Sequence, residues 1–132
     1  MPKAKQISAW IENRPGMLGR VADALGEKKV DIRAFMVAGL DGKGFLRLVV
    51  DKTALALKVL AEHGWESTVD ELAEVVVADR PGELGRVADA LGAAGINIHH
   101  GFVGSARPAQ KGKVSLFLAV DDVAGALKAM RR

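Results

Sequence analysis

The sequence has 132 residues, of which 49% are hydrophobic and 27% are charged, a composition typical of a folded globular protein. Its 19 basic and 16 acidic residues are spread along the chain rather than gathered in the basic stripe that nucleic-acid binding requires. Cysteine is absent, which excludes disulfides, thiolate metal sites and thiol nucleophiles.

We expect a cytoplasmic protein without a membrane partner. Residues 1–6 are polar and basic, and an alternating segment follows them rather than the continuous apolar segment of a secretory signal. No stretch of the sequence approaches the roughly 18 consecutive apolar residues that a membrane-spanning helix needs.

The first half of the sequence predicts the order strand, helix, strand, strand, helix, strand. Side chains alternate over 7–11 and 32–37, which is the period of a half-buried strand. Apolar residues within 18–25 follow the spacing i, i+3, i+4, i+7 of one helical face, directly after the turn residues Pro15 and Gly16. The expected strands are 7–11, 32–37, 45–51 and 65–70. One helix is expected over 18–25, with Gly26 near its end, and a second starts after Asp51, has an apolar face within 57–61 and ends at Gly64.

The second half repeats the first. The segment 14–26 recurs at 80–92 with a single difference, Met17 against Glu83. After the repeated helix, a longer turn over 104–112 separates two strands, a second helix follows at 123–130, and no counterpart of the fourth strand remains. Gly92 and Gly95 are the candidate end residues of the repeated helix.

These elements predict an α+β protein of two tandem ferredoxin-like βαββαβ units, the second lacking its last strand. Each unit is expected to be an antiparallel sheet with two helices on one face, and the predicted domains are residues 1–71 and 72–132. This topology supports RNA binders, metal carriers, enzymes and regulatory modules, so the loop residues must distinguish among them.

The segments from Glu12 to Leu18 and from Asp79 to Leu84 open the two copies, and Val-Asp-Ile or Ile-Asn-Ile follows each helix. These motifs resemble the ACT domain family, and both copies together resemble a stand-alone tandem ACT protein. The resemblance implies small regulatory modules that bind amino acids at interfaces between paired ACT units, often beside an enzyme that they control.

The chemistry of a strand-turn-helix junction suits an amino acid, which carries a carboxylate and an ammonium group. Unpaired N–H groups and the positive dipole end at the helix start favour the carboxylate. Gly16 and Gly82 lack a Cβ and allow close approach to the backbone. Asn13 or Asp79, at the end of the preceding strand, can accept hydrogen bonds from the ammonium group.

The resemblance places ligand-binding residues in both copies, with the later pair of each set presented by a partner unit. They are Asn13, Gly16, Met17, Leu18, Asp31 and Ile32 in the first copy, and Asp79, Gly82, Glu83, Leu84, Asn97 and Ile98 in the second. Where the family commonly has two amides, each copy has one amide and one acid. The added carboxylate could strengthen ammonium binding or repel the ligand carboxylate, and Glu83 could itself fill the anion site.

Several other interpretations stay open at this point. Asn13 and Asp79 could simply cap the helices. His99 and His100 invite a metal site, but neighbouring strand residues point to opposite faces. Lys43-Gly44-Phe45 begins like an RNA-binding strand, although no second aromatic residue follows it in that strand.

We therefore predict a non-catalytic, allosteric amino-acid sensor without cofactor or metal, which pairs as a homodimer and does not bind nucleic acid. The alternative is a regulatory small subunit of a separate amino-acid biosynthetic enzyme, similar to those of acetolactate synthase. No nucleophile elbow, Ser-His-Asp arrangement or phosphate-binding loop appears in the sequence.

Overall fold

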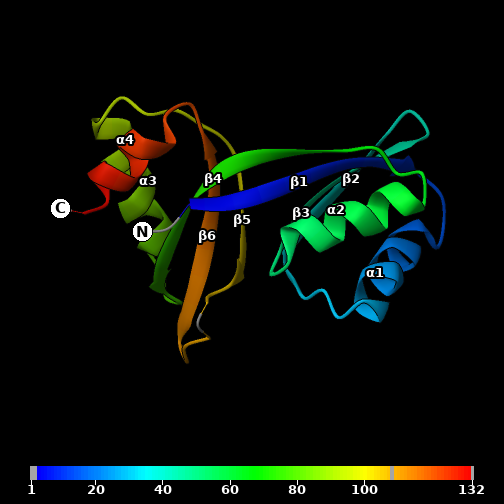
Figure 1. Cartoon of the computed structure of the whole chain (residues 1–132). Helices are drawn as coiled ribbons and strands as arrows, with labels where there is room; N and C mark the ends of the chain where they lie inside the picture. Colours follow the sequence, from blue (N-terminus) through cyan, green and yellow to red (C-terminus); the bar gives the residue numbers. More distant parts are fainter. Residues whose placement is uncertain (1–2, 108, 132) are drawn as a thin grey trace. The chain divides into compact units, whose positions relative to one another are not determined.

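The computed structural model describes residues 3–107 and 109–131, which form six strands and four helices (Figure 1). These residues form two compact units. The first unit is residues 5–70, and the second begins at residue 71 and also includes Lys3 and Ala4. The elements are β1 (Lys3–Glu12), α1 (Met17–Glu27), β2 (Ile32–Leu40), β3 (Lys43–Val50), α2 (Thr53–Glu62), β4 (Ser67–Ala78), α3 (Glu83–Ala93), β5 (Ile98–Ser105), β6 (Lys113–Val120) and α4 (Val123–Ala129).

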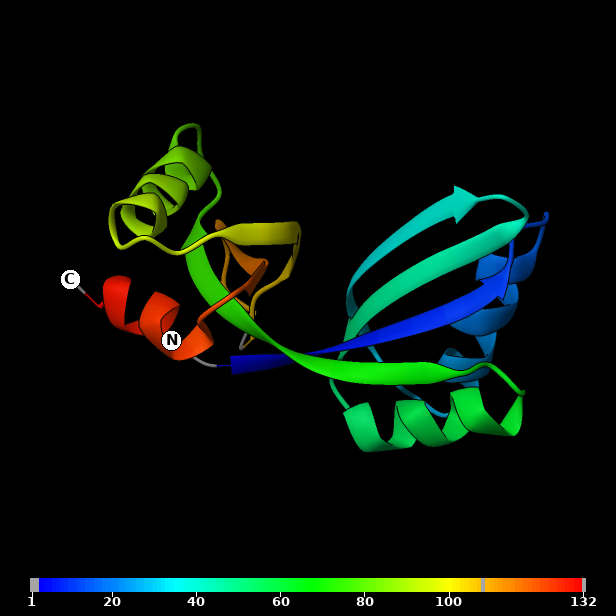
Figure 2. The ribbon, with the colours of Figure 1, turned by 90° about the horizontal axis from the view of Figure 1, so that it is seen from above.

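In the first unit the strands lie in the order β2-β3-β1-β4, with α1 and α2 on one face of the sheet (Figure 2). The pairs β1–β3 and β2–β3 are antiparallel, and β2 forms the outer edge. The buried side chains of β1 and β3 meet the apolar faces of both helices, and they include Ile7, Leu25, Leu46 and Leu60. The predicted α+β fold is confirmed in this unit.

In the second unit β4, β6 and β5 lie side by side as an antiparallel sheet, with a separate core around Val75, Val87, Leu91 and Leu118. The predicted fourth strand of the first copy and the opening strand of the second are one continuous strand, β4. On its other side β4 has β1 as its neighbour, so the first residues of β1 stand where the second copy has no strand of its own. There the Lys3 ammonium lies 3.8 Å from the Glu71 carboxylate.

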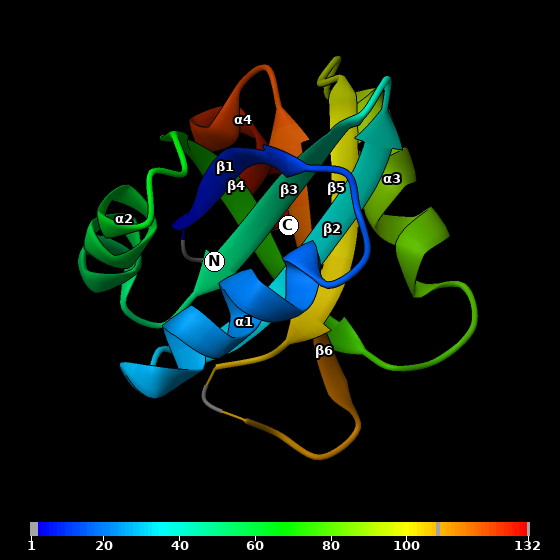
Figure 3. The same ribbon diagram turned by 90° about the vertical axis from the view of Figure 1, so that its right-hand side faces the viewer.

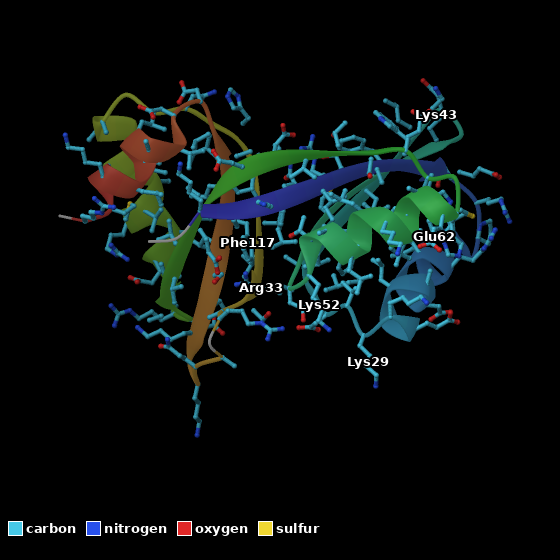
Figure 4. All side chains as sticks on the ribbon, viewed as in Figure 1. Lys29, Arg33, Lys43, Lys52, Glu62 and Phe117 are labelled. Atoms are coloured by element: carbon cyan, nitrogen blue, oxygen red, sulfur yellow. The ribbon has the colours of Figure 1, made fainter. Side chains whose placement is uncertain are left out.

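Gly26 and Gly92 lie near the helix ends, as expected, but neither is the left-handed residue that follows the helix. Gly26 and Gly92 lie inside α1 and α3, which continue to Glu27 and Ala93. The left-handed residue that follows is Lys29 (φ 60°) in the first unit and Gly95 (φ 75°) in the second, as expected for Gly95. Lys52 Nζ donates a hydrogen bond of 2.8 Å to the Lys29 carbonyl, which holds this non-glycine turn against the start of α2 (Figure 4).

Among the described residues, no helix combines the length and the apolar character needed to cross a membrane.

Candidate functional site

The junction between β1 and α1 exposes backbone donors at the helix start. Gly16 is the N-cap residue with φ 89°, a left-handed conformation that disfavours any residue with a Cβ. No side chain caps α1, and within the described part of the chain the N–H groups of Leu18 and Gly19 have no acceptor. Together with the helix dipole, these donors favour a bound carboxylate.

Asn13 lies beside this junction without capping the helix. Its N–H donates to the Gly42 carbonyl at 3.0 Å, and its exposed side-chain amide packs against Gly39 of β2. The capping interpretation is therefore wrong for Asn13, and it is also wrong for Asp79, because Gly82 (φ 91°) caps α3 without a side-chain bond. Asn13 keeps an amide that can accept a hydrogen bond from a ligand.

The second unit has the same backbone at its junction but a different charge. The Asp79 N–H donates to the Gly112 carbonyl at 2.8 Å, and α3 begins at Glu83. The Glu83 carboxylate accepts a hydrogen bond of 3.2 Å from Arg86 and lies 3.6 Å from the Arg80 guanidinium. The hydrogen bond from Arg86, aided by the charge of Arg80, lowers the pKa of Glu83 below its ordinary value. An ionised carboxylate therefore occupies the first turn of α3.

An apolar groove of about 320 Å³ in the first unit is lined by residues of α1, β2 and β3. Figure 3 shows the ribbons of these three elements with α1 towards the viewer. Two residues of the predicted set, Leu18 and Ile32, line it together within one unit, whereas Ile32 was expected to face this site from a partner unit. A third lining residue, Phe35, was not predicted from the sequence; it is 54% exposed and forms the outer wall of the groove. The remaining lining residues are Val21, Ala22 and Leu48.

Asp31 and Asn97 occupy matching places just before β2 and β5. The Asp31 N–H donates to Asp51 Oδ1 at 2.8 Å, and the Asn97 N–H donates to Asp121 Oδ1 at 3.3 Å. The Asp31 bond fixes the backbone at the beginning of β2, whereas Asn13 contacts Gly39 near the end of that strand. Asp31 therefore does not meet the junction of its own unit, and its predicted role in a partner's site stays a prediction.

Leu84 and Ile98 complete the predicted set in the second unit. Leu84 is 61% exposed, while Ile98 is half-buried and packs against the core of the unit. The Asn97 amide nitrogen and His99 Nδ1 are 3.4 Å apart. No group of three or more His, Asp or Glu side chains able to hold a metal ion occurs in the described ranges.

Trp10 of β1 is an aromatic neighbour of Phe45, which the sequence of β3 alone does not reveal. The two residues are opposite each other on β1 and β3, with ring centroids 4.5 Å apart and a tilt of 57°. The Arg47 guanidinium lies 4.4 Å from the Phe45 ring centroid, and burial lowers the pKa of Arg47 while the charge of Asp70 opposes that shift. The Phe45 ring therefore contacts both Trp10 and the Arg47 guanidinium, while the Trp10 side chain is 52% exposed.

Residues 72–132 match the family model of the ACT domain. This match covers the second copy of the repeat, including Asp79, Gly82 and Asn97. No curated protein sequence matches the chain.

Solved structures resemble the chain over nearly its full length. Protein BT0572 from Bacteroides thetaiotaomicron is similar with a TM-score of 0.86 and 22% identity, over 98% of this chain and 87% of that one. The regulatory subunit of aspartate kinase from Thermus thermophilus has a TM-score of 0.69 and 19% identity, over 99% and 96% of the two chains. The corresponding subunit from Thermus flavus has a TM-score of 0.61 and 20% identity, over 98% and 90%. At these identities the likeness shows the fold.

Proposed function

We propose that the protein is a regulatory amino-acid-binding protein built from two tandem ACT units. The observation that carries the proposal is the junction of the first unit, where α1 begins with uncapped N–H groups directly after the turn that follows Asn13. The ACT match over residues 72–132 supports it, because the first copy repeats the same junction motif with one substitution between 14–26 and 80–92.

Binding uses the two charges of the amino acid separately. The Leu18 and Gly19 N–H groups receive the carboxylate, and the Asn13 side-chain oxygen accepts a hydrogen bond from the ammonium group. Asp31 and Ile32 of a partner unit close the site in a homodimer. The ligand then regulates by favouring one arrangement of units over another, to the extent of its differential affinity for the two arrangements.

A thermal-shift screen of the common amino acids against the purified protein tests this function. A ligand at about one hundred times its Kd adds roughly 2.7 kcal/mol to the free energy of unfolding, which raises Tm by several degrees. The Asn13→Ala variant should lose that shift while its own Tm, measured without ligand, stays close to that of the wild type. If no amino acid raises Tm, the proposal is wrong.

A second candidate is a regulatory subunit that acts on a separate amino-acid biosynthetic enzyme, such as acetolactate synthase. The structural likeness to regulatory subunits of aspartate kinase favours this candidate at the level of fold. Affinity purification of the tagged chain from its native cells distinguishes the two. A stoichiometric biosynthetic enzyme would support the subunit, whereas recovery of the chain alone would favour a stand-alone sensor.

A further inference from the structure

The internal repeat provides a matched comparison of the two junctions. Over 14–26 and 80–92 the only difference is Met17 against Glu83. Met17 is 3% exposed and packs in the core of the first unit. The first turn of α1 contains no acidic side chain. Glu83 instead places a carboxylate, held by two arginines, in the first turn of α3. A ligand carboxylate thus meets a like charge at one junction only.

A second difference lies on the strand beside each helix. Phe35 is opposite Leu48 in the β2–β3 pair, and Gly101 is opposite Leu118 in the β5–β6 pair, so Phe35 and Gly101 occupy equivalent positions. A Cβ at Gly101 would lie 2.8 Å from Leu118 Cδ2 and 3.1 Å from the Phe117 carbonyl, which leaves little room for a side chain. The outer wall of the first-unit groove therefore has no equivalent in the second unit.

Leu18 and Leu84, which lie two residues after the N-cap residues Gly16 and Gly82, differ in burial as a result. Leu18 is half-buried and lines the groove with Phe35, whereas Leu84 is 61% exposed. Burial of apolar surface is the main source of affinity for an apolar side chain, and only the first unit combines such a surface with uncapped helix donors and no acidic residue in the first turn.

We propose that each chain binds one amino acid with an apolar side chain, at the junction and groove of the first unit, and that the Glu83 junction does not bind this ligand. This inference rests on the proposed amino-acid-binding function. The carboxylate lies at the start of α1, and the side chain extends along the groove between Leu18 and Phe35. Each additional methylene buried there tightens binding about fourfold.

Isothermal titration of the full chain with alanine, valine, leucine and threonine tests the inference. We expect one ligand per chain, affinity that rises from alanine to valine or leucine, and weaker binding of threonine, because its hydroxyl loses water without gaining a partner. Met17→Glu should weaken binding at least tenfold. Met17→Gln, which has the same shape without the charge, is the matched control and should weaken it much less. Phe35→Ala, at an exposed position, should weaken leucine more than alanine.

The outcomes separate this inference from the function on which it rests. If no amino acid binds, both are wrong. Two ligands per chain, a preference for threonine over valine, or equal effects of Met17→Glu and Met17→Gln would overturn the inference and leave amino-acid binding intact. Unchanged leucine affinity in Phe35→Ala would also overturn it. Circular dichroism melts of each variant establish that lost binding does not reflect an unfolded chain.

Discussion

Replacing Gly39 by alanine should weaken amino-acid binding through Asn13, although Gly39 itself offers no group to the ligand. A Cβ built at Gly39 would lie 2.9 Å from Asn13 Cγ and 3.1 Å from its Oδ1, closer than the 3.4 Å at which ordinary contact begins. The amide must therefore withdraw by about half an ångström or more. A hydrogen bond to a charged group contributes about 1.5–3 kcal/mol, so its loss should raise Kd roughly 10- to 150-fold.

A double-mutant cycle measured by isothermal titration isolates this effect. Gly39→Ala and Asn13→Ala should each weaken binding, and the double variant should be no weaker than Asn13→Ala alone. Gly26→Ala, in the last turn of α1 and away from the site, is the control, since a Cβ there meets no atom within 4 Å and alanine favours the helix, so Tm should rise slightly with Kd unchanged. Additive losses in the double variant, or full affinity in Gly39→Ala, would refute the steric reasoning.

Three further predictions concern stability. Leu25→Ala and Leu91→Ala, at side chains with 0% exposure in the two cores, should each lower the free energy of unfolding by about 2–5 kcal/mol in urea denaturation, and a loss under about 1 kcal/mol would contradict the packing. Asp122→Ala removes the acceptor 2.8 Å from the N–H in the first turn of α4 and should cost about 1 kcal/mol, seen as a lower Tm. Because the hydrogen bond from Arg86 lowers the pKa of Glu83, its ionised form stabilises the fold above the usual carboxyl pKa of about 4.3, and this contribution disappears as pH falls through the lowered value. Glu83→Gln should therefore lose less stability than the wild type on acidification below about pH 4.3, and identical acid melts would contradict the ion pairs.

Local patterns in the sequence predicted most of the fold. Alternation and helical spacing identified the elements, and the Pro-Gly turns located both helix starts, because these features depend on neighbours in sequence. Long-range pairing was not predictable in this way. The continuous strand β4 and the place of β1 beside it depend on strand partners that no local pattern specifies.

For the candidate site, residue type alone suggested helix capping for Asn13 and Asp79, which is wrong, and did not identify Phe35 as a lining residue. Asn13 and Asp79 are favoured helix caps, yet Gly16 and Gly82 take that position because the chain there adopts positive φ. Phe35 was missed because an exposed aromatic residue on a strand is ordinary in isolation. Its significance follows from the strand register, which shows that Phe35 and Gly101 occupy equivalent positions in the two units. Only the first unit therefore has a side chain that forms the outer wall of the groove.

The most direct test of the account is to observe the backbone amides of Leu18 and Gly19 by NMR while the chain is titrated with leucine. The account predicts saturable shifts of both amide signals, with smaller changes at the matching Leu84 and Gly85. Saturable binding that leaves Leu18 and Gly19 unmoved, or that moves the α3 amides instead, would contradict it.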